Sequence, residues 1–64
     1  MVRFLASQGF SILRIRGSHY VMALQEVRTT VPVHGSQVLK IGTLRGILRD
    51  IEMSAVDFGR LWAD

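Results

Sequence analysis

The sequence predicts a single α+β domain, because helical and strand periodicities occupy separate parts of a chain of 64 residues. Near the start, Val2, Leu5 and Ala6 have the i, i+3, i+4 spacing of one helix face. The middle of the chain holds three short apolar or β-branched runs that turn residues separate. Helical spacing returns near the end, in Leu44, Ile47, Leu48 and Ile51. A chain this short forms one domain at most, so we interpret residues 1–64 as one unit.

The first half of the chain predicts a short helix followed by an antiparallel sheet. The helix is expected over residues 2–8, with Gly9 as the residue that ends it. Three strands follow, over residues 10–16, 20–24 and 27–33, with turn signals at Gly17-Ser18 and Gln25-Glu26. Pro32 limits the third strand, because proline cannot donate a hydrogen bond to a sheet. Since both connections are short, the strands should form an antiparallel meander.

The second half predicts a polar loop and then helices that cover one face of the sheet. The loop is expected over residues 34–42, and Thr43 is a suitable N-cap for the helix after it. A last helical segment should begin near Ser54, which forms a capping-box-like pair with Asp57. The apolar stripe of that segment, which we expect to be core, consists of Phe58, Leu61 and Trp62. The predicted order is therefore a short helix, three strands and one or two C-terminal helices.

The composition argues against several classes of protein. Hydrophobic residues make up 48% of the chain, which is enough for a core and too much for a disordered segment. Cysteine is absent and no His, Asp or Glu cluster has ligand spacing, so we expect neither a metal nor another cofactor. The apolar runs are too short for a membrane span. Gln8 and Gly9 interrupt the only stretch that resembles a signal peptide, so a cytoplasmic location is expected.

The charge balance fits either a polyanionic partner or a solvated basic surface. The formal net charge is +3, and seven of the eight basic residues are arginine. Arginine presents a planar fork of donors, which suits phosphate better than the point charge of lysine does. Charge alone does not separate the two interpretations.

Two histidines are candidates for chemistry. His19 follows the Gly17-Ser18 turn, and Arg14 and Arg16 share one face of the strand before that turn. Imidazole titrates near neutral pH, so His19 could move a proton in phosphodiester cleavage if it shares that face. The alternative is a half-buried strand histidine without a chemical role. His34 could be a second acid or base, or could shape the loop through hydrogen bonds.

Three motifs follow one another along nearly the whole chain. They are Gln8-Gly9-Phe10 with Arg14-Ile15-Arg16-Gly17-Ser18-His19-Tyr20, then Thr30-Val31-Pro32-Val33-His34-Gly35, and then the run from Leu39 to Arg49. In this order and in so small a chain, they resemble the HicA family of bacterial toxin ribonucleases. Two features depart from the family pattern. The opening helix starts about one turn later than is usual, and Tyr20 stands where the family often has a second histidine or another polar group.

The resemblance implies a fold like that of the double-stranded-RNA-binding domain, which agrees with the predicted element order. It implies a toxin-type endoribonuclease that cleaves mRNA, with His19 as the catalytic acid or base. A HicB-like antitoxin would cover the site and hold the chain, otherwise monomeric, in a heteromeric complex. Our mechanistic hypothesis needs no metal, and its candidate RNA-binding residues are Arg14, Arg16, Ser18, Tyr20 and Lys40.

Two other functions stay open at this point. The fold could bind RNA without cleaving it, through contacts to 2′-hydroxyl groups and phosphates. Alternatively, the basic face could serve an acidic protein partner. The substitution His19→Ala separates cleavage from mere binding, because it should leave RNA bound and remove cleavage only where His19 is catalytic.

Overall fold

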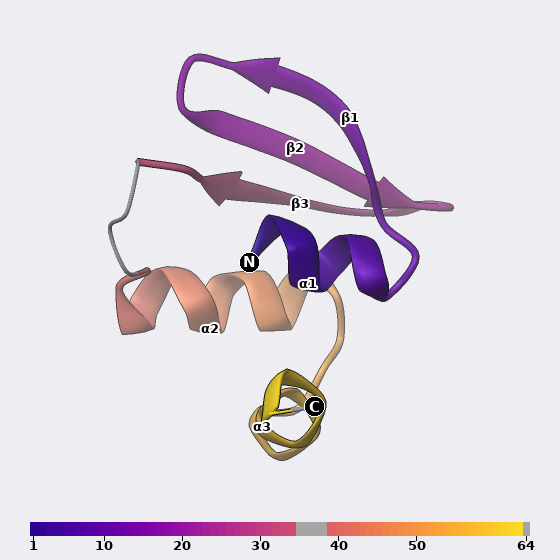
Figure 1. Ribbon diagram of the computed structural model, residues 1–64, viewed down its shortest axis with the longest axis vertical. Coiled ribbons are helices and arrows are strands. Elements are labelled where there is room, and N and C mark those ends of the chain that lie inside the picture. The colour runs from indigo at the N-terminus through magenta and orange to yellow at the C-terminus, as the bar shows by residue number, and fades with distance from the viewer. Residues whose placement is uncertain (35–38, 64) are drawn as a thin grey trace.

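The computed structural model describes residues 1–34 and 39–63 and confirms the predicted α+β order (Figure 1). The strands β1, β2 and β3 span Ser11–Arg16, His19–Leu24 and Val27–Pro32. The helices α1, α2 and α3 span Val2–Ser7, Ile41–Asp50 and Ala55–Ala63. The one or two C-terminal helices expected from the sequence are therefore two.

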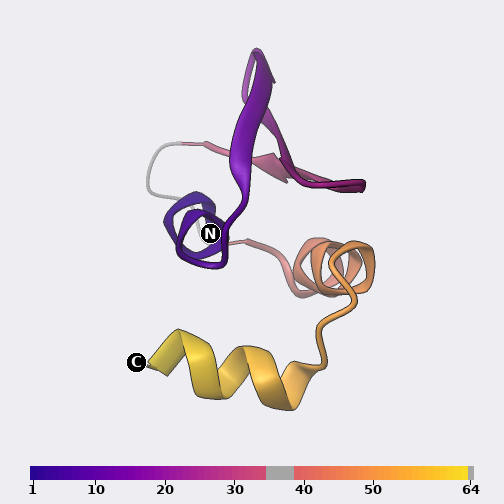
Figure 2. The same cartoon turned by 90° about the vertical axis from the view of Figure 1, so that its right-hand side faces the viewer.

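The sheet is an antiparallel meander of order β1-β2-β3, as predicted. Two-residue turns join its strands at 17–18 and 25–26, and their first residues, Gly17 and Gln25, have φ of 58° and 56°. Positive φ at this place matches the turn to the right-handed twist of the strands. All three helices lie on one side of the sheet, which leaves its other side uncovered by helices (Figure 2).

The end of α1 feeds the chain into β1 through a Schellman motif. Gly9 has φ 101° and its N–H donates to the carbonyl of Ala6 at 3.0 Å. The N–H of Phe10 donates to the carbonyl of Leu5, also at 3.0 Å. Gly9 therefore ends the helix as predicted. Because the cap uses the N–H of Phe10, β1 begins one residue later than expected.

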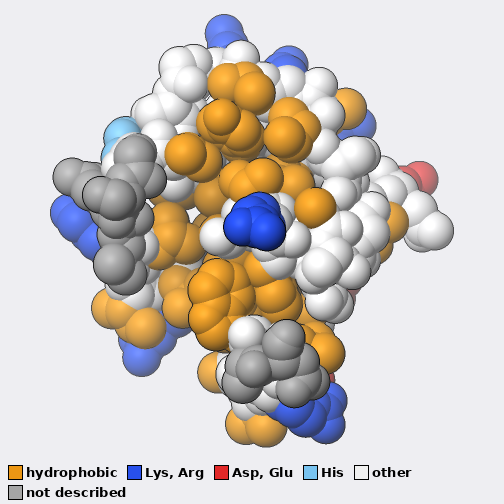
Figure 3. Space-filling model, in the orientation of Figure 1, with side chains coloured by type: hydrophobic (Ala, Val, Ile, Leu, Met, Phe, Trp, Pro, Cys, Tyr) orange, Lys and Arg blue, Asp and Glu red, His pale blue; other side chains and the backbone are white. Residues whose placement is uncertain are grey.

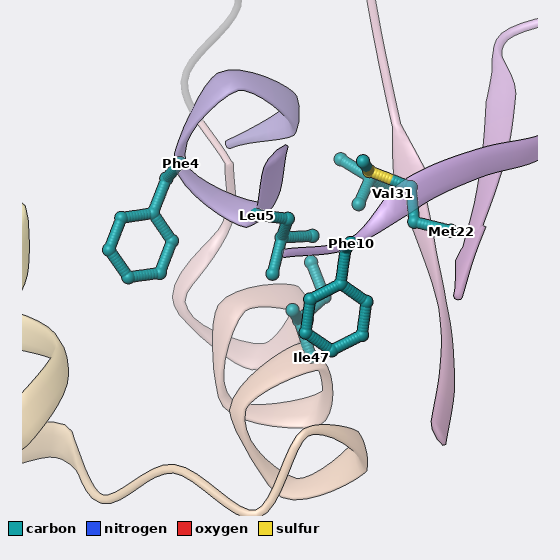
Figure 4. Packing of buried hydrophobic residues seen from close by; sticks show 6 residues of the cluster. All are labelled: Phe4, Leu5, Phe10, Met22, Val31 and Ile47. Carbon is teal, nitrogen blue, oxygen red and sulfur yellow. The ribbon is translucent and has the colours of Figure 1, made fainter. Parts of the chain in front are cut away.

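The core lies between the sheet and the helix pair α1 and α2 (Figure 4). Its most deeply buried side chains, at 2% exposure or less, are Leu5, Met22, Val31 and Ile47. The buried hydroxyl of Thr29 donates to Asp50 at 2.9 Å, which joins β3 to the end of α2. Apolar packing and the hydrogen bond from Thr29 to Asp50 thus join the helix and sheet layers.

The start of α2 corrects one prediction. Lys40, not Thr43, is the N-cap residue, and Thr43 lies inside the helix. No side chain caps this end, and the first helical hydrogen bond runs from the N–H of Leu44 to the carbonyl of Lys40. The helix starts early because Leu39 packs against the core and positions the next residue. The predicted loop is therefore too long at its end, and its residues 35–38 lie outside the described residues.

Helix α3 is attached to the rest of the domain by an aromatic cluster. Its start is capped as predicted, with the Asp57 N–H donating to Ser54 Oγ at 3.0 Å. The ring centroids of Phe58 and Trp62 lie 5.1 and 5.5 Å from that of Phe4. The expected burial of the whole stripe is wrong, because 36% of Leu61 and 53% of Trp62 are exposed. Figure 2 shows α3 as the helix farthest from the sheet, beyond α1 and α2.

Candidate nucleic-acid interface

The strand register divides the side chains of the sheet between two faces. Residues that pair directly across antiparallel strands point to the same side, and neighbours along a strand alternate. Buried Met22 pairs with Thr29, and buried Val31 pairs with Tyr20, so these four side chains belong to the inner face that packs on the helices. The intervening residues belong to the opposite, outer face.

The outer face brings together three of the residues predicted from the sequence. His19 pairs directly with Arg16, and the next outer pair along the hairpin joins Arg14 to Val21. Directly opposed side chains have Cβ atoms about 5 Å apart, within reach of the long arginine side chains. All three side chains are exposed. The condition set by the sequence, that His19 shares a face with both arginines, is met.

Two further outer-face residues were missed by the sequence argument. Arg28 pairs with Ala23, and Thr30 pairs with Val21, so both side chains lie on the face of His19. Both are exposed. The alternation of Arg28 and Thr30 with buried neighbours was visible in the sequence, but only the register shows that their face is also that of His19.

The outer face is basic, and the side chains at its centre are small and apolar. Val21 and Ala23 on the central strand are half-buried and lie between the exposed arginines of β1 and β3. Among the described residues, the one ion pair joins Arg60 to Asp57 on α3, far from this face. The described outer-face positions include no carboxylate that would neutralise Arg14, Arg16 or Arg28. Such a surface attracts a polyanion that is able to lie flat across strands.

Two other candidate residues, Tyr20 and Lys40, lie off the outer face, and a third, Ser18, directly precedes His19 in the turn. Tyr20 is on the inner face, where it pairs with Val31 and packs against the core. Ser18 is half-buried in the turn, and its carbonyl accepts a 2.6 Å hydrogen bond from the N–H of Val33. Lys40 caps α2 on the helical side of the molecule. The structure therefore does not bring the side chains of Tyr20 and Lys40 to the outer face.

His34 lines a groove whose lining includes none of the other candidate residues. This histidine is exposed just after β3, and the groove, of about 710 Å³, lies between α1, the end of β3 and α3. Phe4 and Trp62 form part of the same groove. Among the described residues, no hydrogen bond joins His34 to His19.

The comparison with known families gives this site its context. The family described as HicA toxin of bacterial toxin-antitoxin matches residues 1–53 of the 64. The chain belongs to this family. HicA membership makes it a toxin of a toxin–antitoxin system, with an antitoxin as its partner, in a family of generally ribonuclease-type toxins. No curated protein and no solved structure matches the chain.

The HicA match includes the entire outer face and stops before α3. Helix α3 begins at Ala55, beyond the matched residues 1–53. Within residues 1–34 and 39–63, no three His, Asp or Glu side chains are grouped to hold a metal. None of the helices in the same residues is long and apolar enough to cross a membrane.

Proposed function

We propose that this HicA toxin is an endoribonuclease that cleaves mRNA on the outer face of its sheet, with His19 as the acid or base. The observation that carries the proposal is the direct cross-strand pair of His19 and Arg16. It places a proton-transfer group beside a cationic fork on an open, basic surface. We place the reaction in the cytoplasm, where mRNA is available.

The proposed reaction uses the 2′-hydroxyl of the RNA as the nucleophile. Its oxygen forms a new bond to phosphorus while the bond to the leaving 5′-oxygen breaks, which yields a 2′,3′-cyclic phosphate. His19 takes the proton of the 2′-hydroxyl or donates one to the leaving oxygen. Arg16 stabilises the charge that develops on the non-bridging oxygens. DNA, which has no 2′-hydroxyl, is not a substrate in this scheme.

The other outer-face residues hold the RNA in this scheme. Arg14 and Arg28 lie on opposite sides of the central strand, so together they contact phosphates along a chain that crosses the sheet. The exposed hydroxyl of Thr30 is placed to contact a phosphate or a 2′-hydroxyl. Tyr20, on the inner face, and Lys40, at the start of α2, lie outside this surface, so this scheme gives them no contact with RNA. Ser18, next to His19 in the turn, stays a candidate RNA contact.

RNA binding without catalysis is the second candidate function. One observation favours it: among the described residues, no hydrogen bond joins the His19 ring to a second side chain that would orient it. A histidine that acts by proton transfer is usually oriented by a second group. Substrate would have to supply that orientation here.

The test compares the native chain with His19→Ala on labelled, unstructured mRNA in the presence of a chelator. Cleavage by the native chain should leave 2′,3′-cyclic or 3′-phosphate ends. Loss of general acid–base catalysis should slow His19→Ala by about 10²- to 10⁴-fold, while RNA binding remains.

The matched control is His34→Ala, which removes the other exposed histidine of the chain. We expect it to cleave RNA at the native rate. Equal loss of activity in the two variants would contradict the assignment of His19. If the native chain and His19→Ala both bind RNA but the native chain does not cleave it, RNA binding without catalysis replaces the proposed function.

A further inference from the structure

The outer edge of β1 is a free strand edge with an unusual composition. β1 pairs only with β2, so in the described part of the chain its other side has no partner strand. All six residues of β1 are exposed. They include three large apolar side chains, Ile12, Leu13 and Ile15, which are 47%, 51% and 52% exposed.

The two faces of β1 differ in chemistry. Ile12 and Ile15 pair with Met22 and Tyr20, so they lie on the inner face, beyond the part of it that the helices cover. Figure 3 shows hydrophobic side chains exposed over the region where Figure 1 places β1 and β2. Arg14 and Arg16 lie on the outer face of the same strand. A strand added here would thus meet apolar side chains on one face and cations on the other.

The backbone at Ile15 is available for such pairing. The pair that closes a two-residue turn, here Arg16 and His19, exchanges hydrogen bonds, and pairs then alternate between bonded and non-bonded. Ile15 and Tyr20 form the next, non-bonded pair, so the N–H and C=O of Ile15 point to the free edge. The opposite sheet edge is poorer, because Pro32 removes a donor from β3.

Charge decides between the possible occupants of this edge. A second copy of the chain would set Arg14 and Arg16 beside another pair of arginines, and opposed like charges destabilise strand pairing. The bulge between Ile12 and Arg14 also disfavours pairing along a long, uniform edge. A short extended segment with acidic residues on one side and apolar residues on the other complements both faces.

We infer that the antitoxin binds this toxin by adding an extended segment of alternating acidic and apolar residues to the edge of β1, centred on Ile15. The inference deepens the proposed function, because Arg14 and Arg16 would then hold carboxylates in place of phosphates. Its backbone contacts are those of β-strand addition, in which main-chain hydrogen bonds provide affinity and alternate side chains provide specificity.

The test measures amide hydrogen exchange of the isotope-labelled toxin, alone and in complex with its co-expressed antitoxin. Exchange of the Ile15 amide should slow by at least tenfold in the complex. Ile15→Pro removes this N–H at an edge position where proline is tolerated. It should weaken antitoxin binding by about tenfold or more, because a main-chain hydrogen bond to the antitoxin is lost. A tenfold loss corresponds to about 1.4 kcal/mol of binding free energy. Ile15→Val, the matched control, keeps the N–H and should bind normally.

A probe peptide separates this inference from the proposed function. An acetylated, amidated peptide of alternating valine and glutamate should slow Ile15 exchange, whereas a peptide with the same residues in two blocks should not. Neither measurement needs RNA cleavage, so an inactive chain still gives an answer. If Ile15→Pro fails to fold, the exchange experiment on the native chain decides.

Three results would overturn the inference. One is native antitoxin affinity in a folded Ile15→Pro variant. Another is an Ile15 amide that exchanges equally fast in the free and bound toxin. The third is protection of Ile15 in the free toxin that grows with its concentration, which would assign the edge to a second copy.

Discussion

The strands β1 and β3 belong to one sheet, yet the helices cover them very differently. On β3, inner-face Thr29 and Val31 are 3% and 1% exposed, whereas on β1 inner-face Ile12 and Ile15 remain about half exposed. Helix α2 packs on β3, while the β1–β2 hairpin extends away from both α1 and α2 (Figure 2). The sheet therefore has a packed half and an unpacked half.

This difference teaches where stability and recognition lie in a small domain. Apolar side chains stabilise the fold only where they leave water, and on β1 they do not. Exposed apolar side chains lower the solubility of a protein, and a chain that stays monomeric gains nothing from them. The same strand carries two of the arginines that flank His19. We therefore assign folding to the inner face of β2 and β3, and contacts with other molecules to β1 and to the outer face of the sheet.

The largest expected effect tests this assignment within one face of the sheet. Met22 and Ile15 both lie on the inner face, but Met22 is fully buried and Ile15 is 52% exposed. Met22→Ala should reduce the free energy of unfolding by about 2–5 kcal/mol, as truncation of a buried side chain does. Ile15→Ala should change it by less than about 0.5 kcal/mol. Urea denaturation of both variants measures this, and similar losses would break the comparison.

A smaller effect tests whether the RNA interface on the outer face extends to β3. Arg28→Gln should weaken RNA binding without preference for sequence and reduce the salt slope of log affinity by about 0.7 for single-stranded RNA, because one phosphate contact is lost. Arg45→Gln, on the helical side, is the control and should keep the native slope. A slope that Arg28→Gln leaves unchanged would confine the interface to the β1–β2 hairpin.

The smallest effect concerns the end of α2, the helix that packs on β3. Helix α2 ends in the same motif as α1, with the Met53 N–H donating to the Leu48 carbonyl at 2.9 Å. Glu52 holds the left-handed position there, with φ 56°, where α1 has Gly9. Glu52→Gly should stabilise the fold by about 0.5 kcal/mol, since relief of the left-handed strain exceeds the added entropy of the unfolded chain. Thermal unfolding measures it, and a lower melting temperature would contradict the strain argument.

The sequence was sufficient for the element order and for part of the site. Helical and strand periodicities are local, so they identified the helices and the three strands without knowledge of their packing. Short connections fixed the antiparallel pairing. With that pairing, residues two apart on β1 share a face, which correctly grouped Arg14 with Arg16.

The sequence predictions failed where side-chain packing and strand register determine the position of a residue. Tyr20 begins an apolar run from 20 to 24 with no alternation, so nothing local showed that it faces inward while His19 faces outward. Thr43 has a capping side chain, but Leu39 and the core fix the helix start earlier, at Lys40. The stripe on α3 predicted burial, yet the small domain offers only Phe4 and its neighbours to cover Trp62. Arg28 needed the β2–β3 register to be recognised.

The aromatic cluster gives the molecule a spectroscopic reporter. Trp62 is the only tryptophan in the sequence, and its ring centroid lies 5.3 Å from that of Phe58 and 5.5 Å from that of Phe4. Its indole is half in water and half against those rings. Undocking of α3 would remove the contact with α1 and shift the emission to the red, with the sheet unchanged. Fluorescence can therefore follow the helix beyond the family match separately from the folding of the rest.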